Sequence, residues 1–484
     1  MRYGDFGWQG HGPVPYRVLC DIPLVSGGVE THDYAGIIPP EPTGRPVRAL
    51  TMSCNYDAGF PDADVVAHAQ RHDADLVLFL GDQFYEWNGG FFVETAPIGR
   101  ATLDYLRKWI QFGWSYRELF RNRPSICLLD DHDVYHGNLW GSSGRAARAA
   151  SDATAQSDSG GYRMPADWVN MAQLTQTSHM PDPVDPVPVG QGIAVYFCEW
   201  RYAGIRFAII EDRKFKSAPR DILPAEAEVS NGYARHPDHH RARERTLEAE
   251  LIGERQMQFL RRWRTGCDAR GFNVLLSATP FVAMQTLPIG TTGYEITPKL
   301  PIPAPGDYVA GDTPTRDMDT NGWPQRRRDE VVTLLADACD IHLVGDQHLG
   351  AVLRYGVQEY GDSCFAFAAP ALCNLWPRRW WPAPGPRGNL GDFRDGFGNR
   401  MTVHAVTNPV RTGRTPAELY DLATGYGLVE FDAAAGTMTL RCWPRHADPA
   451  AGGRPYAGWP IRLVRRKGRR STATEAAGGP RTSP

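Results

Sequence analysis

"VLFLGDQFYEW" occupies residues 77–87, and it decides how the rest of the chain is interpreted. Four apolar residues, 77–80, are followed at once by Gly81 and Asp82, with Tyr85 and Glu86 close behind. The apolar run predicts a buried parallel strand, and ligands of open α/β sheets lie just beyond the carboxyl ends of such strands. Asp82 is therefore a candidate site residue, although Gly-Asp pairs are also common in ordinary turns.

The same arrangement recurs at three other predicted strands. "VRALTMSC" (47–54) ends at Cys54, "SICLLDDHD" (125–133) ends in four polar residues that Asn138 follows, and "CDIHLVGDQH" (339–348) ends in Asp346 and His348. One acid after a strand is a coincidence. Four strand ends with Asp, His, Asn, Tyr and Cys donors predict a binuclear metal site.

The residue types at these ends suit such a site. Two neighbouring cations need a shared carboxylate, and Asp82 is the natural candidate. A thiolate from Cys54 and a phenolate from Tyr85 suit a trivalent or softer metal, whereas Asn and carboxylate oxygens suit a harder one. His132 lies between two aspartates and can protonate a leaving alkoxide. The structural alternatives are a turn acid, a core tyrosine and a core cysteine.

Composition limits the protein class. The chain has 484 residues, 42% of them hydrophobic, which is enough for a sizeable core. A formal net charge of −3 argues against nucleic acid or an anionic membrane as a general partner. No stretch approaches the roughly 20 apolar residues of a membrane span, and the N-terminus lacks a signal core and a twin-arginine pair. We therefore expect a soluble, cytoplasmic protein. Nine scattered cysteines without a C-x-x-C pair form neither a zinc-finger pattern nor a disulfide framework.

The order of predicted elements indicates an α/β architecture with a mixed sheet. Residues 1–46 are rich in Gly and Pro and are expected to form an irregular lead-in, 47–465 a catalytic domain, and 466–484 a basic and polar disordered tail. Three long inserts are candidates for covering the site. His342 alternates with apolar residues and is expected in the core. The inserts span about 140–192, 216–247 and 285–325, the helices 62–72, 103–123 and 248–267, and the strands 47–54, 74–82, 125–133, 195–215 (a pair), 272–280, 339–348, 363–372, 425–432 and 437–443.

Taken in order, the motifs resemble a known family. "SC" (53–54), "GDQFYEW" (81–87), "DDHDVYHGNLWG" (130–141), "EDRKF" (211–215), "GDQHLG" (345–350) and "GYGLVEFD" (425–432) are similar to the alkaline phosphatase D family of calcineurin-like metallophosphoesterases. The resemblance spans about residues 47–445. It implies a metallophosphatase-type αββα sandwich, with two mixed sheets flanked by helices and the metals at the strand ends.

The resemblance also implies roles for individual residues. Cys54, Asp82 and Tyr85 would hold one metal, by analogy iron. Asn138 and Asp346 would hold a second, calcium or another divalent ion such as manganese or zinc, and His348 would complete the centre. His132 would be the acid or an oxyanion stabiliser, Asp131 would hold it or touch a metal, and Arg213 would contact the phosphoryl group. A structural ion pair for Arg213, with Lys214 as its rival, remains an alternative.

Two positions depart from the family pattern. Typical members read Asp-Asp-His-Glu-Val, whereas this chain has Asp133 in place of the Glu. His136 and Gly137 precede Asn138, which shifts the Asn by about one residue and makes His136 an alternative ligand.

The predicted function is hydrolysis of a small phosphate ester by a hydroxide held at the two metals, as a phosphodiesterase or a phosphomonoesterase. "CNLWPRRWWPAPGP" (373–386) places three Trp beside two Arg, either as a stacking surface or as a cap on the core or a pocket rim. The competing interpretation is a catalytically idle metal-binding or interaction protein on the same fold, and the intact set of Asp82, His132, Asp346 and His348 argues against it. The oligomeric state is left open.

Overall fold

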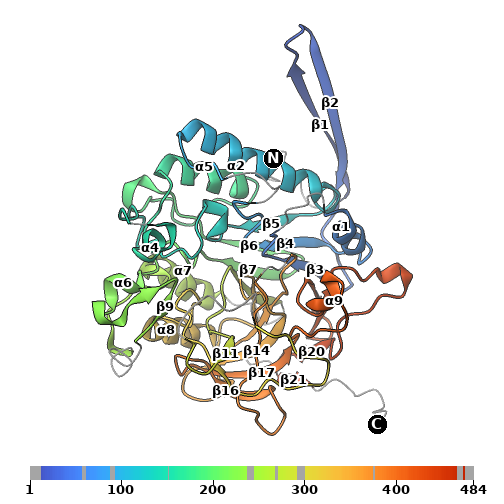
Figure 1. The fold of residues 1–484 in the computed structure, drawn as a ribbon. Coiled ribbons are helices and arrows are strands. Elements are labelled where there is room, and N and C mark those ends of the chain that lie inside the picture. Colours follow the sequence, from blue (N-terminus) through green and yellow to red (C-terminus); the bar gives the residue numbers. More distant parts are fainter. Residues whose placement is uncertain are drawn as a thin grey trace.

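A computed structural model describes residues 12–56, 62–87, 93–150, 152–236, 245–266, 271–291, 300–373, 376–465 and 472–474. Two large sheets form the body of the protein (Figure 1). The predicted tail, 466–484, lies outside the described residues apart from 472–474, which form a short strand.

The first sheet has seven strands and contains the opening motif. Its strands β3, β4 and β5 are parallel neighbours at one end of the sheet, and the remaining pairs are antiparallel. In spatial order the strands are β21 (Thr472–Thr474), β20 (Ile461–Val464), β19 (Thr437–Pro444), β18 (Gly425–Asp432), β3 (Val47–Met52), β4 (Leu76–Leu80) and β5 (Ser125–Leu128).

The second sheet has eight strands. β7, β10, β13 and β15 run parallel to one another at its centre, and antiparallel strands lie on both sides of them. In spatial order the strands are β16 (Gly391–Arg394), β17 (Arg400–Val406), β14 (Ala351–Gly356), β15 (Phe365–Ala368), β13 (Ile341–Val344), β10 (Phe272–Ser277), β7 (Ile205–Ile209) and β6 (Cys198–Tyr202).

Strand β4 shows why the two sheets stack. Leu78 packs with Phe207 of β7 in the core between the sheets, while Val77 and Phe79 pack on the opposite face. Since successive strand residues point to opposite faces, a strand that is apolar throughout must be covered on both sides. One side is the second sheet and the other is a layer of helices, which is the αββα sandwich expected from the sequence.

Helices cover the two outer faces. Four helices contribute to the core outside the seven-stranded sheet, and two contribute to the core outside the eight-stranded sheet. The first group comprises α1 (Ala63–Gln70), α2 (Ile98–Ser115), α3 (Arg117–Phe120) and α5 (Ala166–Thr177), and the second comprises α7 (Gly253–Thr265) and α8 (Gln325–Leu335).

The three inserts contain short elements of their own. These are α4 (Ala153–Asp158), α6 (Pro219–Ile222), the β8 (Val229–Ser230) and β9 (Tyr233–Ala234) pair, and the β11 (Thr286–Pro288) and β12 (Asp312–Pro314) pair. The remaining elements are α9 (Pro416–Leu419) and the 3-10 turns His132–Val134, Gly190–Gly192, Ala225–Ala227 and Pro449–Ala451.

The N-terminal lead-in corrects the sequence expectation. Within the predicted irregular segment, β1 (Val14–Pro23) and β2 (Val29–Ile38) pair along their whole length as an antiparallel hairpin that projects from the body (Figure 1). Gly27 and Gly28 have φ of 84° and 96° at its turn, a conformation that favours glycine. Gly27 and Gly28 thus mark the turn of this hairpin. Contacts of the hairpin base with the distant helix α3 could not be inferred locally.

Among the described residues, no helix is both long enough and apolar enough to cross a bilayer.

Candidate metal centre

The predicted donors meet at one edge of the stacked sheets because the strands that carry them end there. Cys54, Asp82 and Asp346 each stand two residues beyond a parallel strand, β3, β4 and β13 respectively. Their φ angles, and that of His348, lie between 50° and 56°. Such angles are uncommon for residues other than glycine and cluster at functional sites. The backbone is therefore held in a strained conformation where the donors lie.

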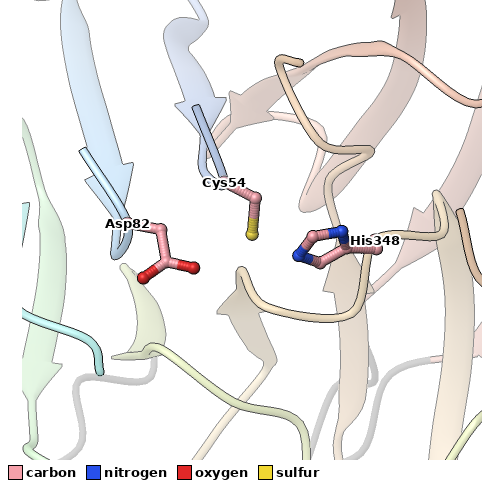
Figure 2. A group of neighbouring side chains, drawn as sticks. All are labelled: Cys54, Asp82 and His348. Carbon is pink, nitrogen blue, oxygen red and sulfur yellow. The ribbon is translucent and has the colours of Figure 1, made fainter. Parts of the chain in front are cut away.

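Cys54, Asp82 and His348 form the first donor group. The sulfur, a carboxylate oxygen and a ring nitrogen lie within 4.8 Å of one another, and all three residues are buried. Figure 2 shows the three side chains pointing toward a common centre from separate segments. The Tyr85 hydroxyl lies 3.1 Å from His348 Nε2. The structure thus brings together the three donors predicted for the first metal and adds His348 to them.

Asp82, Asp131 and His132 form a second donor group within the same 4.8 Å limit. Asp82 belongs to both groups, as a bridging carboxylate would. The His132 backbone N–H donates to Asp82 Oδ1 at 3.3 Å and to Asp131 Oδ1 at 3.0 Å. The loop that carries the acid-histidine motif is thereby tied to the strand-end carboxylate.

Asn138 and Asp346 line the same cavity as these groups. The Asn138 backbone N–H donates to Asp131 Oδ2 at 2.6 Å, and its Nδ2 donates to the backbone oxygen of Asn231 at 3.3 Å. His136, the alternative ligand, accepts a hydrogen bond from the Arg163 backbone at 2.9 Å and is not among the residues that line the cavity. The geometry therefore favours Asn138 over His136.

Arg213 contacts the site carboxylates from outside the cavity. It is buried, its Nε donates to Asp130 Oδ1 at 2.5 Å, and it also bonds Asp319. Its Nη2 lies 3.1 Å from Asp346 Oδ2. Arg213 is not among the residues that line the cavity. The structural ion pair left open by the sequence is the arrangement found.

Lys214, the rival of Arg213, is also turned away. Its ammonium group donates to Glu211 at 2.7 Å and to Gln173 at 2.5 Å, and neither partner lines the cavity.

The donor chemistry of the centre fits bound cations. Burial, reinforced by the charge of Asp131, raises the pKa of Asp82 well above its usual value. Burial and the Asp82 charge do the same to the pKa values of Cys54 and Tyr85. Asp346 Oδ2 is buried and lies 3.1 Å from Arg213 Nη2, but no hydrogen bond of good geometry reaches it from the described residues. A buried cluster of anionic donors is unfavourable alone and becomes favourable around metal ions.

Asp131 and His132 form a charged pair within this cluster. Burial alone would raise the pKa of Asp131, but the charges of Arg213 and His132 and two N–H donors lower it to about 2. Burial alone would lower the pKa of His132, but Glu86, Asp131 and Asp82 raise it well above its usual value. His132 Nδ1 lies 2.7 Å from Glu86 Oε2. Glu86 thus orients the imidazole, and the neighbouring carboxylates favour its protonated form.

The donors open onto a cavity of about 450 Å³. All three long inserts contribute to its wall, for example through Thr154, Tyr233 and Asp317. Tyr56, Trp87 and Trp376 form an aromatic side, and Arg163 and Arg378 are its two arginines. The inserts thus shape the site, and the Trp-Arg motif at 373–386 reaches the pocket rim, as one of its two interpretations expected.

A sequence model of PhoD-like phosphatases matches residues 49–369 of the chain. The chain belongs to the PhoD-like phosphatase family. It is accordingly a hydrolase that acts on phosphate esters with the help of metal ions.

Solved structures agree with this fold. A structure of PhoD superposes with a TM-score of 0.54 at 14% identity, covering 94% of this chain and 77% of the other. A purple acid phosphatase from yellow lupin (Lupinus luteus) gives a TM-score of 0.44 at 11% identity, covering 91% of this chain and 58% of the other. A dimetal phosphatase from Danio rerio gives 0.36 at 10% identity, covering 83% and 97%. Comparison with curated protein sequences finds no match.

Asp133 of this PhoD-like phosphatase is a site residue that sequence reasoning missed. Its Oδ2 accepts the backbone N–H groups of Asp82 at 2.8 Å and Asp130 at 2.9 Å. Its Oδ1 accepts the N–H of Gln83 and the side chain of Gln176, each at 3.1 Å. Asp133 therefore joins the ends of β4 and β5. The Asp at a position where the family pattern has Glu was a sign that this residue is unusual. Nothing in the sequence indicated which groups its side chain contacts.

Sequence reasoning identified the Trp-Arg motif but did not single out Arg378 within it. Arg378 Nη1 donates to the backbone oxygen of Asp346 at 3.3 Å, and its Nη2 to Asp317 at 3.4 Å. These bonds hold the guanidinium at the cavity wall beside the donors. The Trp-Arg motif contained the signal, but the fold was needed to separate Arg378 from Arg379, which pairs with Asp312 at 2.7 Å.

Proposed function

We propose that this phosphatase hydrolyses a small phosphate ester at a binuclear centre in which Asp82 bridges two metals. The observation that carries the proposal is that Asp82 belongs to both donor groups. Cys54, Tyr85 and His348 would complete the first metal's ligands. Asn138, Asp346 and Asp131 would serve the second.

The donors favour two different metals. A thiolate and a phenolate suit iron, whereas the carboxylate and amide oxygens suit calcium or another divalent ion, with manganese and zinc as alternatives. When bound, the two cations would activate a water for attack on phosphorus and neutralise the phosphoryl oxygens.

His132 supplies the proton for the leaving oxygen. Nδ1 is bound to Glu86, so Nε2 is the nitrogen that can act on a substrate in the cavity. The Glu86 carboxylate, which is not assigned to a metal, stabilises the protonated ring, which is the form that an acid catalyst requires.

Arg378 takes the phosphoryl-binding role first assigned to Arg213. Its guanidinium lines the cavity next to Asp346, and a planar fork can bind two phosphoryl oxygens. Arg213 instead holds Asp130 and Asp346 in place from below.

The lining of the cavity favours a diester substrate. Tyr56, Trp87 and Trp376 line it. A phosphodiester carries a second alcohol group that a monoester lacks, and these rings offer apolar surface for such a group.

The direct test compares bis(p-nitrophenyl) phosphate with p-nitrophenyl phosphate after loading with iron and calcium, manganese or zinc. We expect a higher kcat/KM for the diester, and His132→Asn should lower its kcat by about 10²–10⁴-fold. Equal or better turnover of the monoester would contradict the diester assignment. No turnover of either ester under any metal combination would contradict the proposed mechanism.

A further inference from the structure

The β1–β2 hairpin, residues 14–38, extends beyond the body of the protein (Figure 1), and we call it the arm. Its base is fastened by the Tyr16 hydroxyl, which donates to the Arg121 backbone at 2.6 Å, and by the Tyr34 hydroxyl, which donates to the Arg117 backbone at 2.6 Å. Every residue from Arg17 to Asp33 is exposed. A two-stranded hairpin alone is marginal in water, so the outer arm lacks the packing that ordinarily stabilises a sheet.

The two faces of the arm differ. Residues paired across an antiparallel ladder share a face, which places Tyr16, Val18, Cys20 and Ile22 on the face that also carries Tyr34. At the base this face docks on the body through the two tyrosines. Farther out it continues with Val18 and Ile22, which are 42% and 45% exposed, and with His32 and Glu30 of β2, which pair with Cys20 and Ile22. The arm face that docks on the body at its base, the docking face, therefore extends farther than the body itself.

Helix α2 carries an apolar surface that is exposed to solvent. Leu103, Ile110 and Trp114 are 69%, 66% and 64% exposed. Their spacing of seven and four places them on one side of the helix, and we call them the α2 stripe. Arg117, whose backbone anchors the arm, stacks on the Trp114 ring at 4.3 Å. The stripe and the arm base are therefore continuous.

The free part of the arm and the α2 stripe are similar in length and opposite in charge. The seven strand residues 17–23 span about 23 Å, and residues 103–114 of α2 span about 18 Å. The arm carries one arginine against three acids, of which Glu30 lies on the docking face. Residues 98–121 carry five basic and two acidic side chains, and of these Lys108 and Asp104 are buried against each other. An acidic arm fits a basic helix and is repelled by an anionic bilayer.

We infer that the occupant of the α2 stripe is the arm of a second copy of this chain, exchanged reciprocally in a two-fold dimer. A single copy cannot make the contact, because its arm points away from its body (Figure 1). The free part of the arm face is about 10 Å wide and 23 Å long, so two arm-helix contacts bury on the order of 900 Å² in total. That area is below the about 1,200 Å² of stable complexes and fits a weak, reversible dimer.

The first test measures the solution mass of the full chain and of matched variants. The wild type should approach twice the 53.7 kDa of one chain at high micromolar concentration and return to one chain on dilution. V18S/I22S and L103S/I110S should each reduce the mass to one chain. L19S/V29S, on the opposite arm face, and Leu174→Ser, an exposed residue of α5, should leave it doubled. No mutated residue lines the cavity, so phosphatase activity per chain reports that each variant is folded.

Mixing the two disruptive variants tests the exchange itself. V18S/I22S retains an intact stripe and L103S/I110S retains an intact arm, so the mixed dimer regains one of two contacts. We expect dimers to reappear in the mixture only. A dimer built arm to arm would survive L103S/I110S and would overturn the proposal.

Two other results would overturn it as well. The first is a wild type that remains one chain at all concentrations. The second is a monomer that co-sediments with vesicles containing anionic phospholipid and loses this binding in V18S/I22S, which would identify a membrane as the occupant.

Discussion

The sequence predicted which residues follow the ends of the strands. The positions of Asp82, Cys54, Asp346 and His348 were predictable because a strand end is a local feature. The contacts of these residues with distant parts of the chain were not predictable. Arg378 and Asp133 act through contacts with residues 61 and 51 positions away in the chain, Asp317 and Asp82 respectively. Only the fold determines which arginine faces the cavity.

At the residue scale, the two arginines should respond differently to truncation. Arg378→Ala removes a charge-assisted contact to substrate, worth about 1.5–3 kcal/mol. It should therefore raise KM for a chromogenic phosphodiester by about 10–100-fold, with a smaller fall in melting temperature than Arg213→Ala, because its carboxylate bond is the 3.4 Å contact with Asp317. Steady-state kinetics and thermal unfolding of the same sample check both parts.

Arg213→Ala is the contrasting variant. It leaves Asp130, Asp319 and Asp346 buried without their cation, and breaking a buried ion pair costs about 3–5 kcal/mol. We expect a clear loss of unfolding free energy in denaturant titration. If Arg213→Ala raised KM and left stability unchanged, Arg213 would be the phosphoryl ligand after all.

At the scale of elements, apolar runs located most central strands, including β3, β4, β10 and β13. Strand β17 was missed because its residues alternate between buried and half-buried positions and its sequence, "RMTVHAV", has no apolar run. Helix α2 begins at Ile98, five residues before its predicted start, and the predicted helix breaks at Tyr116, which has φ −94° and ψ 7°. Runs of buried residues are visible in sequence, whereas half-buried elements depend on their neighbours.

Asp133→Asn tests the junction between β4 and β5. An amide can accept through one oxygen only, so the NH2 group would face two N–H donors that now bond a carboxylate oxygen. Leaving buried donors unsatisfied costs about 1–3 kcal/mol each, so we expect a loss of about 3 kcal/mol in unfolding free energy. Asp307→Asn, at an exposed loop position, is the matched control. Equal stability of both variants would show that Asp133 does not hold the strand ends.

At the scale of the whole molecule, the layered sandwich followed from the alternation of strands and helices together with the family resemblance. The arm and the cavity walls did not, because they depend on tertiary contacts of Gly- and Pro-rich segments. His342 was expected in the core and is confirmed there, with its ring nitrogens 2.9 Å from the Ser277 hydroxyl and 3.0 Å from the Tyr355 hydroxyl.

His342 also makes the stability of the whole chain depend on pH. Burial lowers its pKa to about 3, against about 6.5 in an unfolded chain. As pH falls below 6.5, the unfolded chain takes up the proton first, so stability is lost between pH 6.5 and 3 at about 1.4 kcal/mol per unit. The His342→Gln variant should therefore lose about 2 kcal/mol less than the wild type between pH 6.5 and 5. Denaturant titrations at both pH values measure this difference. His32→Gln, on the exposed arm, is the control, and parallel losses in His342→Gln and wild type would contradict the account.

The central claim is that Asp82 joins two metals, and the most direct measurement is metal content per chain. Purified wild type, loaded and then desalted, should hold about two ions. Asp82→Asn should hold one or none and lose phosphodiester hydrolysis, while Asp307→Asn should match the wild type. Two ions retained in Asp82→Asn, or no bound metal in an active wild type, would contradict the bridging centre.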